Sequence, residues 1–270
     1  MSKRFVVTNY IFKTPKVKGQ GFRVVMLSDL HNKCYGVDNA SLIQAIDNAH
    51  PDMIICAGDM ITAVKGHESD WTTTYSFLEN LTQRYQVFYG LGNHESRLNR
   101  HRETFGTGYE ELVSRLKEIG VRVLVNEHEH LIIKNNNICI TGLDIAGIYY
   151  KRFSFINMPE DYLPIKLGDS DPEAVNLLIA HNPDYFGRYK EWGADISFSG
   201  HLHGGVMRIP GIGGVISPQF HLFPRYSGDM YLEDGKAIVV SKGIGEHTIP
   251  IRINNPAEVV VLDVVEDDSI

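Results

Sequence analysis

Short apolar runs recur along the chain, and polar residues follow each of them. Because a short apolar run between turns is typical of a strand buried on both faces, we predict a strand for each run. These runs are residues 22–27, 53–57, 87–91, 175–180 and 195–199. Residues 5–12, 237–241 and 259–264 are predicted as further strands.

Between the strands, the chain carries patterns expected of helices and of one hairpin. Residues 109–119 place their apolar side chains on one face, and Gly120 follows where a left-handed cap is expected. Residues 131–133 and 138–140 form a predicted hairpin that turns on three asparagines, which tolerate positive φ. Further helices are predicted at residues 39–49, 69–84 and 183–192.

Residues 145–172 carry aromatic residues and prolines without a clear period, so we predict an irregular connection there. Two interpretations remain open: the segment forms a wall of the substrate cleft, or it packs into a satellite core. Strands that alternate with helices indicate an α/β fold. With 270 residues and 43% hydrophobic content, the chain is interpreted as one domain over residues 1–270.

Composition excludes several classes of protein. A net charge of -7 argues against binding to nucleic acid, which usually needs a basic face. Cys34, Cys56 and Cys139 are an odd number without framework spacing, so we predict reduced thiols in a cytoplasmic protein. No apolar run is long enough for a membrane-spanning helix, which indicates a soluble protein, although peripheral contact with a bilayer stays compatible.

The apolar runs end in side chains that can bind metal ions. In an open α/β sheet, ligands bind at the edge formed by the carboxyl ends of the strands, so we expect these side chains to converge. Imidazoles mixed with carboxylates suit Mn, Fe, Co, Ni or Zn better than Mg or Ca. Together these side chains provide enough ligands for two cations that share one carboxylate. The set comprises Asp29, His31, Asp59, Asn93, His94, His181, His201 and His203. The alternative is that these residues cap helices or satisfy buried backbone groups.

His201 and His203 stand one residue apart and are bracketed by glycines. On an extended segment their rings would point to opposite sides, so that each would serve a different metal. We expect Gly204 and Gly205 to keep this loop small beside a bound phosphate.

Five blocks together resemble the calcineurin-like metallophosphoesterases, in that family's order. They are Asp29-Leu30-His31, Gly58-Asp59, Gly92-Asn93-His94-Glu95, Ala180-His181-Asn182-Pro183 and Gly200-His201-Leu202-His203. The C-terminal part, including residues 206–210 and 241–252, is similar to a bacterial phosphodiesterase-type branch that includes membrane-anchored relatives. The resemblance implies a four-layer α/β/β/α sandwich.

The resemblance also implies the roles of individual residues. Asp29, His31, Asp59 and His203 would hold one metal, and Asp59, Asn93, His181 and His201 the other. A bridging role suits Asp59, because a carboxylate has two oxygens to share. Two ions, with Mn, Fe and Zn favoured, would supply a bridging hydroxide for in-line attack on phosphorus. His94 would stabilise the phosphoryl charge or protonate the leaving group, with Glu95 as its orienting partner.

We therefore predict a dimetal-dependent phosphoesterase that cleaves a phosphodiester or pyrophosphate bond in a small molecule. One alternative is a hydrolase of lipid-linked phosphate or pyrophosphate at a membrane surface. Another is a non-catalytic binding scaffold. The filled ligand positions and the presence of His94 argue against this alternative. Arg208 and Arg252 are predicted to grip the substrate phosphate through bidentate hydrogen bonds.

Overall fold

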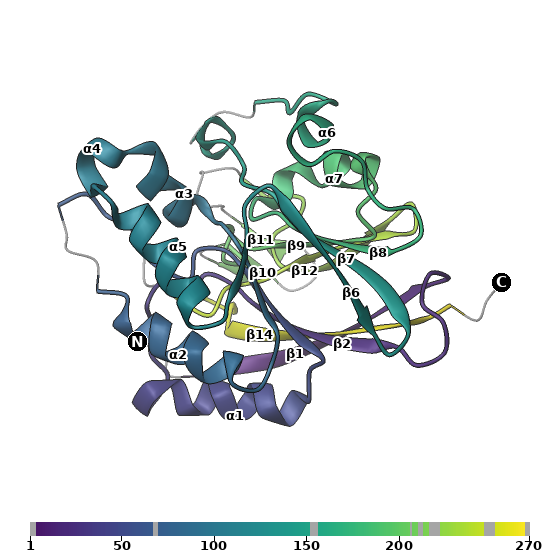
Figure 1. The fold of residues 1–270 in the computed structure, drawn as a ribbon, viewed down its shortest axis with the longest axis horizontal. Helices are drawn as coiled ribbons and strands as arrows, with labels where there is room; N and C mark the ends of the chain where they lie inside the picture. The colour runs from purple at the N-terminus through teal and green to yellow at the C-terminus, as the bar shows by residue number, and fades with distance from the viewer. Residues whose placement is uncertain are drawn as a thin grey trace.

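Two six-stranded sheets form the centre of the molecule (Figure 1). The computed structural model describes residues 4–66, 70–151, 156–205, 207–209, 213–215, 222–245 and 252–267. The first sheet has the order β1-β14-β2-β3-β4-β5. Its strands are β1 (Phe5–Thr14), β14 (Ala257–Glu266), β2 (Phe22–Leu27), β3 (Met53–Ala57), β4 (Val87–Gly90) and β5 (Arg122–Leu124).

The second sheet has the order β12-β13-β9-β8-β7-β6. Its strands are β12 (Asp229–Glu233), β13 (Lys236–Val240), β9 (Ile196–Ser199), β8 (Val175–Ile179), β7 (Asn136–Gly142) and β6 (Glu127–Ile133). A small two-stranded ribbon pairs β10 (Arg208–Ile209) with β11 (Gly213–Gly214). Strands β2 to β5 run parallel in the first sheet, and β7, β8, β9 and β13 run parallel in the second. Each sheet therefore presents several carboxyl ends at one edge.

The two sheets pack face to face through a shared apolar core. Val24 and Met26 of β2 point into it, and Leu177 and Phe198 of the second sheet belong to the same core. Val25 of β2 points to the opposite face, because successive side chains of a strand alternate. Burial of both faces explains why the central strands are apolar along their whole length.

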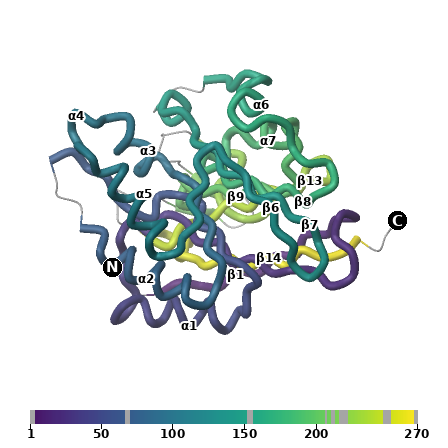
Figure 2. Tube along the Cα trace, in the orientation of Figure 1, coloured from purple at the N-terminus to yellow at the C-terminus, as the bar shows by residue number. Residues whose placement is uncertain are grey.

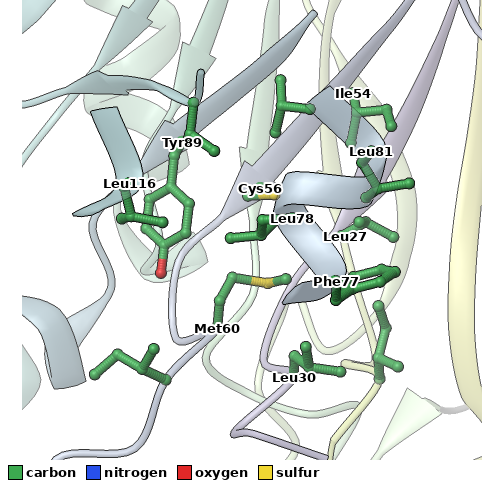
Figure 3. Close-up of a cluster of buried hydrophobic side chains, with 14 of the residues drawn as sticks. Leu27, Leu30, Ile54, Cys56, Met60, Phe77, Leu78, Leu81, Tyr89 and Leu116 are labelled. Carbon is green, nitrogen blue, oxygen red and sulfur yellow. The ribbon is translucent and has the colours of Figure 1, made fainter. Parts of the chain in front are cut away.

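Helices cover the outer face of each sheet and complete four layers (Figures 1 and 2). On the first sheet these are α1 (Ala40–Ala49), α2 (Thr72–Thr82) and α5 (Gly108–Glu118); on the second, α6 (Tyr162–Leu167) and α7 (Phe186–Trp192). Figure 3 shows Leu27 and Ile54 of the first sheet beside Leu78 and Leu81 of α2. The predicted α/β/β/α sandwich is confirmed.

Most predicted elements are present with small changes at their ends. Gly120 has a φ of 87° and ends α5 in the left-handed conformation that was predicted for it. The turn of the β6–β7 hairpin was predicted on three asparagines, but it consists of Lys134 and Asn135, with φ values of 50° and 66°. Asn136 already pairs with Ile133 in the ladder, because a two-residue turn needs positive φ only at its two central positions.

Some elements were not predicted. Two helices follow β4, namely α3 (Asn93–Arg100) and α4 (Arg102–Phe105), and their polar sequences hide the helical period. The segment 145–172 contains a short 3-10 helix, η2 (Gly147–Tyr150), and α6; its residues 152–155 lie outside the described part of the chain. The helix predicted over 69–84 is described from Thr72, and residue 69 also lies outside. Among the described helices, none has the length and apolar character needed to cross a membrane.

Candidate metal centre

The predicted ligands lie where strands of both sheets end. Asp29 follows β2, Asp59 follows β3, and Asn93 begins the helix after β4. His181 follows β8, and the loop with the other two histidines follows β9. Hydrogen bonds connect the ends of one sheet to those of the other: His201 N donates to Asp29 Oδ1 over 3.1 Å, and His181 Nδ1 donates to Ala57 O over 2.6 Å. The carboxyl ends of the two sheets therefore meet at one place.

Asp29, His31 and His203 form the first cluster, in which one ligand atom from each residue lies within 4.8 Å of the others. His203 Nε2 lies 3.2 Å from Asp29 Oδ1 and 3.2 Å from His31 Nε2. The His31 and His203 rings stack at an angle of 11°. Three atoms with lone pairs thus face one point, which is the arrangement that a cation requires.

Asp59, His181 and His201 form the second cluster under the same distance limit. His181 Nε2 lies 3.2 Å from Asp59 Oδ2. Asn93 belongs to this neighbourhood, because the next residue, His94, donates its backbone N–H to Asp59 Oδ1 over 2.8 Å. The Oδ1 atom of Asn93 is buried and has no hydrogen-bond partner among the described residues.

Asp59 lies within reach of both clusters. Besides its contacts with His181 and His201, it forms a third group with His31 and His94 in which ligand atoms lie within 4.8 Å of one another. His31 is also a member of the first cluster. A carboxylate between two imidazole groups is suited to bridge two cations, since each of its oxygens can serve a different one.

The ring of His181 is oriented for metal binding. Its Nδ1 donates to the carbonyl oxygen of Ala57 over 2.6 Å, so that Nε2 faces the Asp59 carboxylate. Burial alone lowers the pKa of His181, yet the carboxylates of Asp59 and Asp29 raise it to about 10. The site therefore attracts positive charge, and its donor set fits a transition-metal ion.

The pKa values of the two buried carboxylates are shifted in opposite directions. Burial raises the pKa of Asp29 to about 6. Burial acts in the same direction on Asp59, but the imidazoles of His181 and His94 hold the pKa of Asp59 well below its usual value. Asp59 is consequently ionised at neutral pH and supplies the negative charge at the junction of the clusters.

Five of the predicted ligands have positive φ, a conformation that residues other than glycine rarely adopt. They are Asp29 (53°), His31 (50°), Asp59 (51°), His201 (67°) and His203 (49°). The prediction that His201 and His203 lie on an extended segment is therefore wrong. Both residues have positive φ, and their rings still reach different clusters. His201 lies 5.4 Å from His181 between ring centroids, while His203 stacks on His31.

Glu95 supports Asp59 rather than His94, which corrects its predicted role. Its Oε2 accepts hydrogen bonds from the backbone N–H groups of Asp59 (3.0 Å) and Gly92 (2.9 Å). Its Oε1 accepts from Tyr89 Oη (2.7 Å) and Ile61 N (3.3 Å). This carboxylate is fully buried, and burial raises its pKa to about 7. Glu95 thus fixes the turn that carries Asp59.

His94 has one ring nitrogen occupied. The backbone N–H of Ala63 donates to His94 Nδ1 over 3.0 Å, so the neutral ring carries its proton on Nε2. Burial lowers the pKa of His94, which favours this neutral form. Its ring lies edge-on to His31, with centroids 5.0 Å apart. The proton on Nε2 is therefore beside the first cluster.

Two supporting residues had no signal in the sequence. Thr62 Oγ1 lies 3.3 Å from His31 Nδ1, and Asn255 Nδ2 donates to the carbonyl oxygens of His203 (2.6 Å) and Gly205 (2.7 Å). A Cβ added at Gly204, whose φ is 71°, would lie 2.3 Å from Asn255 Oδ1. Gly204 therefore lets the loop lie against Asn255, which is a different role from the one predicted beside phosphate.

Arg208 and Arg252 contact the protein itself. Arg252 donates to the carbonyl oxygens of Lys242 (2.8 Å), Gly243 (3.1 Å) and Gly245 (2.5 Å). Arg208 donates to Ser227 O over 2.9 Å and forms an ion pair with Asp229. Substrate binding by Arg208 or Arg252 stays a prediction.

The segment 145–172 contributes both to a core and to the site. Tyr149, Met158 and Leu163 belong to the core under the second sheet. The ring of Tyr150 contacts His201 edge-on, with centroids 4.9 Å apart. The interpretation as a satellite core is thus confirmed, whereas a wall of the substrate cleft stays a prediction.

Comparisons with known proteins agree with this geometry. The family model described as calcineurin-like phosphoesterase matches residues 22–205. An uncharacterized metallophosphoesterase of Aquifex aeolicus is 26% identical over 261 residues, which are 96% of this chain and 91% of that protein. One of Campylobacter jejuni is 28% identical over 272 residues, with coverage of 94% and 64%. Phosphodiesterase YaeI of Escherichia coli is 24% identical over 248 residues, with coverage of 90% and 82%.

Proposed function

The chain belongs to the calcineurin-like phosphoesterase family, and we propose that it cleaves a phosphodiester or pyrophosphate bond of a small molecule with two metal ions. As a member of this family, it is a metal-dependent phosphoesterase. The observation that supports the two-metal proposal is the position of Asp59, which reaches His181 and His201 on one side and His31 on the other.

In this proposal each cluster holds one ion. Asp29, His31, Asp59 and His203 would bind the first, and Asp59, Asn93, His181 and His201 the second. When bound, the two ions would lower the pKa of a water molecule and offset the negative charge of the phosphoryl oxygens. Mn, Fe and Zn are the ions that the imidazole and carboxylate donors favour.

His94 is the proposed hydrogen-bond donor to the substrate. Ala63 fixes the tautomer that carries the proton on Nε2, and the lowered pKa keeps the ring neutral in the absence of substrate. That proton can form a hydrogen bond with a phosphoryl oxygen or with the leaving oxygen, which offsets the negative charge that develops there as the bond to phosphorus breaks. Asp59 Oδ1 accepts a hydrogen bond from the backbone N–H of His94, which fixes the position of His94 relative to the bridging carboxylate.

We also propose that residues 1–270 form one domain. Strand β14, near the end of the chain, lies between β1 and β2, which are near its beginning. Removal of either end would expose the edge of a central strand in the first sheet. The two chain ends are therefore parts of the same folded unit.

A lipid-linked substrate at a membrane surface is the second candidate function. Leu222 and Phe223 are 67% and 56% exposed in the part of the chain that follows the His203 loop, and Ile253 is 47% exposed. Exposed apolar side chains of this kind favour contact with lipid. Co-sedimentation with vesicles of phosphatidylethanolamine and phosphatidylglycerol tests this function, and a protein that stays in the supernatant contradicts it. The non-catalytic alternative is disfavoured because both clusters are complete and His94 is present.

The test of the proposed function is hydrolysis of bis-p-nitrophenyl phosphate by the purified protein. We expect turnover with Mn²⁺, loss of turnover after chelation, and recovery when Mn²⁺ is restored. The Asp59→Asn variant should lose turnover, because it removes the charge shared by both clusters. Absence of turnover with several metals, in protein shown to contain two ions, would contradict the proposal.

A further inference from the structure

One arginine reaches back from the far end of α3 toward the metal centre. Asn93 is the first residue of this helix and Arg100 the last, so they lie about two turns apart on the same face. Helical side chains lean toward the N-terminus of their helix. In agreement, Arg100 Nη2 lies 3.5 Å from the backbone carbonyl oxygen of Asn93. The guanidinium therefore lies beside the residue that is proposed to bind the second ion.

The short helix η2 holds this guanidinium and also borders the second cluster. A Cβ added at Gly147 would lie 2.8 Å from Arg100 Nε and 3.0 Å from its Cζ, so the guanidinium packs against the Gly147 backbone. Three residues later, the ring of Tyr150 contacts His201. One segment thus fixes the position of the guanidinium relative to the cluster.

Arg100 differs from the other arginines near the site in what it contacts. Arg97 donates to the carbonyl oxygen of Ala63 over 2.9 Å, and Arg102 forms an ion pair with Glu110. Among the described residues, Arg100 has no carboxylate partner, and its side chain is exposed. A guanidinium has five N–H donors, so an exposed one without a carboxylate partner can bind two oxygens of a phosphate at once.

We propose that Arg100, held in place by Gly147, binds a second anionic group of the substrate and so favours pyrophosphate-linked substrates over simple diesters. The inference rests on the proposed function. The reacting phosphate would occupy the two clusters and His94, whereas Arg100 lies by the backbone carbonyl of Asn93, outside the clusters. A second phosphate, joined to the reacting one through a single oxygen, can extend to that position.

Two variants distinguish the effect of the position of the guanidinium from the effect of its charge. Arg100→Gln removes the charge. Gly147→Ala keeps the charge but places a methyl group where the guanidinium packs. Because the φ of Gly147 is outside the left-handed region and the displaced atoms end a flexible side chain, the fold should accommodate alanine. Arg102→Gln is the matched control. Arg102 lies on α4, is exposed, and forms an ion pair with Glu110 of α5.

The test compares two substrates and one ligand on the Mn-loaded protein. The substrates are bis-p-nitrophenyl phosphate and diadenosine diphosphate, and the ligand is methylenediphosphonate, whose binding is measured by calorimetry. A hydrogen bond to a charged group corresponds to about a tenfold change in affinity. We therefore expect Arg100→Gln and Gly147→Ala to raise the KM for diadenosine diphosphate about tenfold, with a similar loss of methylenediphosphonate binding. The KM for the diester should rise by less than about threefold.

Equal changes in KM for both substrates, or methylenediphosphonate binding unaffected by either variant, would overturn the inference. So would an equal effect of Arg102→Gln, which would indicate general electrostatic attraction. A wild-type protein that cleaves neither substrate would count against the proposed function alone. The calorimetric comparison of the variants would still decide whether Arg100 binds a second anionic group.

Discussion

The side-chain amide of Asn255 donates a hydrogen bond of 2.6 Å to the backbone carbonyl oxygen of His203. The same amide donates to Gly205 O over 2.7 Å, and Asn255 is buried. Asn255 lies two residues before β14 of the first sheet, while the His203 loop follows β9 of the second. These hydrogen bonds therefore join a ligand-bearing loop of one sheet to the other sheet.

The Asn255→Asp variant is expected to weaken metal binding at the first cluster. Aspartate would present a charged oxygen to two carbonyl oxygens that have lost their donor, at a cost of about 2 to 4 kcal/mol in unfolding free energy. The His203 loop would move away from Asn255 and carry its ring out of position. Calorimetric titration of metal-free protein with Mn²⁺, together with urea denaturation, measures both effects.

Asn254→Asp is the matched control for this variant. It adds the same charge at the preceding residue, which is exposed. Its effect on stability should stay within about 0.5 kcal/mol, as for most surface substitutions. Equal metal affinity in the two variants would show that Asn255 does not position the loop.

Replacement of His94 by glutamine should lower kcat about 10²- to 10³-fold, because the loss of one positioned hydrogen-bond donor to a developing negative charge costs about that much. Bound metal should stay at the wild-type amount, since His94 belongs to neither proposed ligand set. The loss should be larger for an alkyl leaving group, on whose oxygen more negative charge develops, than for p-nitrophenolate. A variant whose kcat falls equally for both leaving groups would exclude a hydrogen bond from His94 to the leaving oxygen.

Glu95→Gln should destabilise the protein by about 2 to 4 kcal/mol. The carboxylate accepts four hydrogen bonds, and a glutamine NH₂ group would face two donors. Chemical denaturation measures the change. Glu79→Gln, at an exposed position on α2, should change stability by less than about 0.5 kcal/mol. Similar stabilities of the two variants would contradict the role of Glu95 in holding the Asp59 turn.

Two glycine substitutions should act in opposite directions. A Cβ at Gly200 would lie 2.0 Å from Ser28 Oγ and 2.2 Å from Asp29 Oδ2, so Gly200→Ala should displace Asp29 and cost about 1 to 3 kcal/mol. A Cβ at Gly187 in α7 would meet no atom within 4 Å, and Gly187→Ala should stabilise the protein by about 0.5 to 1 kcal/mol. Thermal denaturation distinguishes the signs, and a stabilised Gly200→Ala variant would contradict the close approach to Asp29.

The sequence predicted the central strands because burial of both faces leaves runs such as residues 22–27 almost wholly apolar. It did not predict α3, because Leu98 is the only large apolar residue between Asn93 and Arg100, and a single apolar residue marks no helical face. It also placed the hairpin turn one position late, since asparagine tolerates positive φ but Lys134 adopts it as well.

The residues that converge on the site could be predicted because parallel strands bring their carboxyl ends to one edge. The residues that hold these ligands in position could not be predicted. Asn255 lies far along the chain from His203, and a single asparagine carries no signal of the contact. The left-handed conformations of His201 and His203 likewise follow from the packing of the loop, and a short His-x-His motif does not encode them.

The most direct test of the two-metal account is a crystal structure of the Mn-loaded protein with anomalous scattering data. The account predicts two anomalous peaks, one among Asp29, His31, Asp59 and His203 and one among Asp59, Asn93, His181 and His201, with Asp59 contacting both. A single peak, or two peaks that do not share Asp59, in protein that hydrolyses bis-p-nitrophenyl phosphate would contradict it.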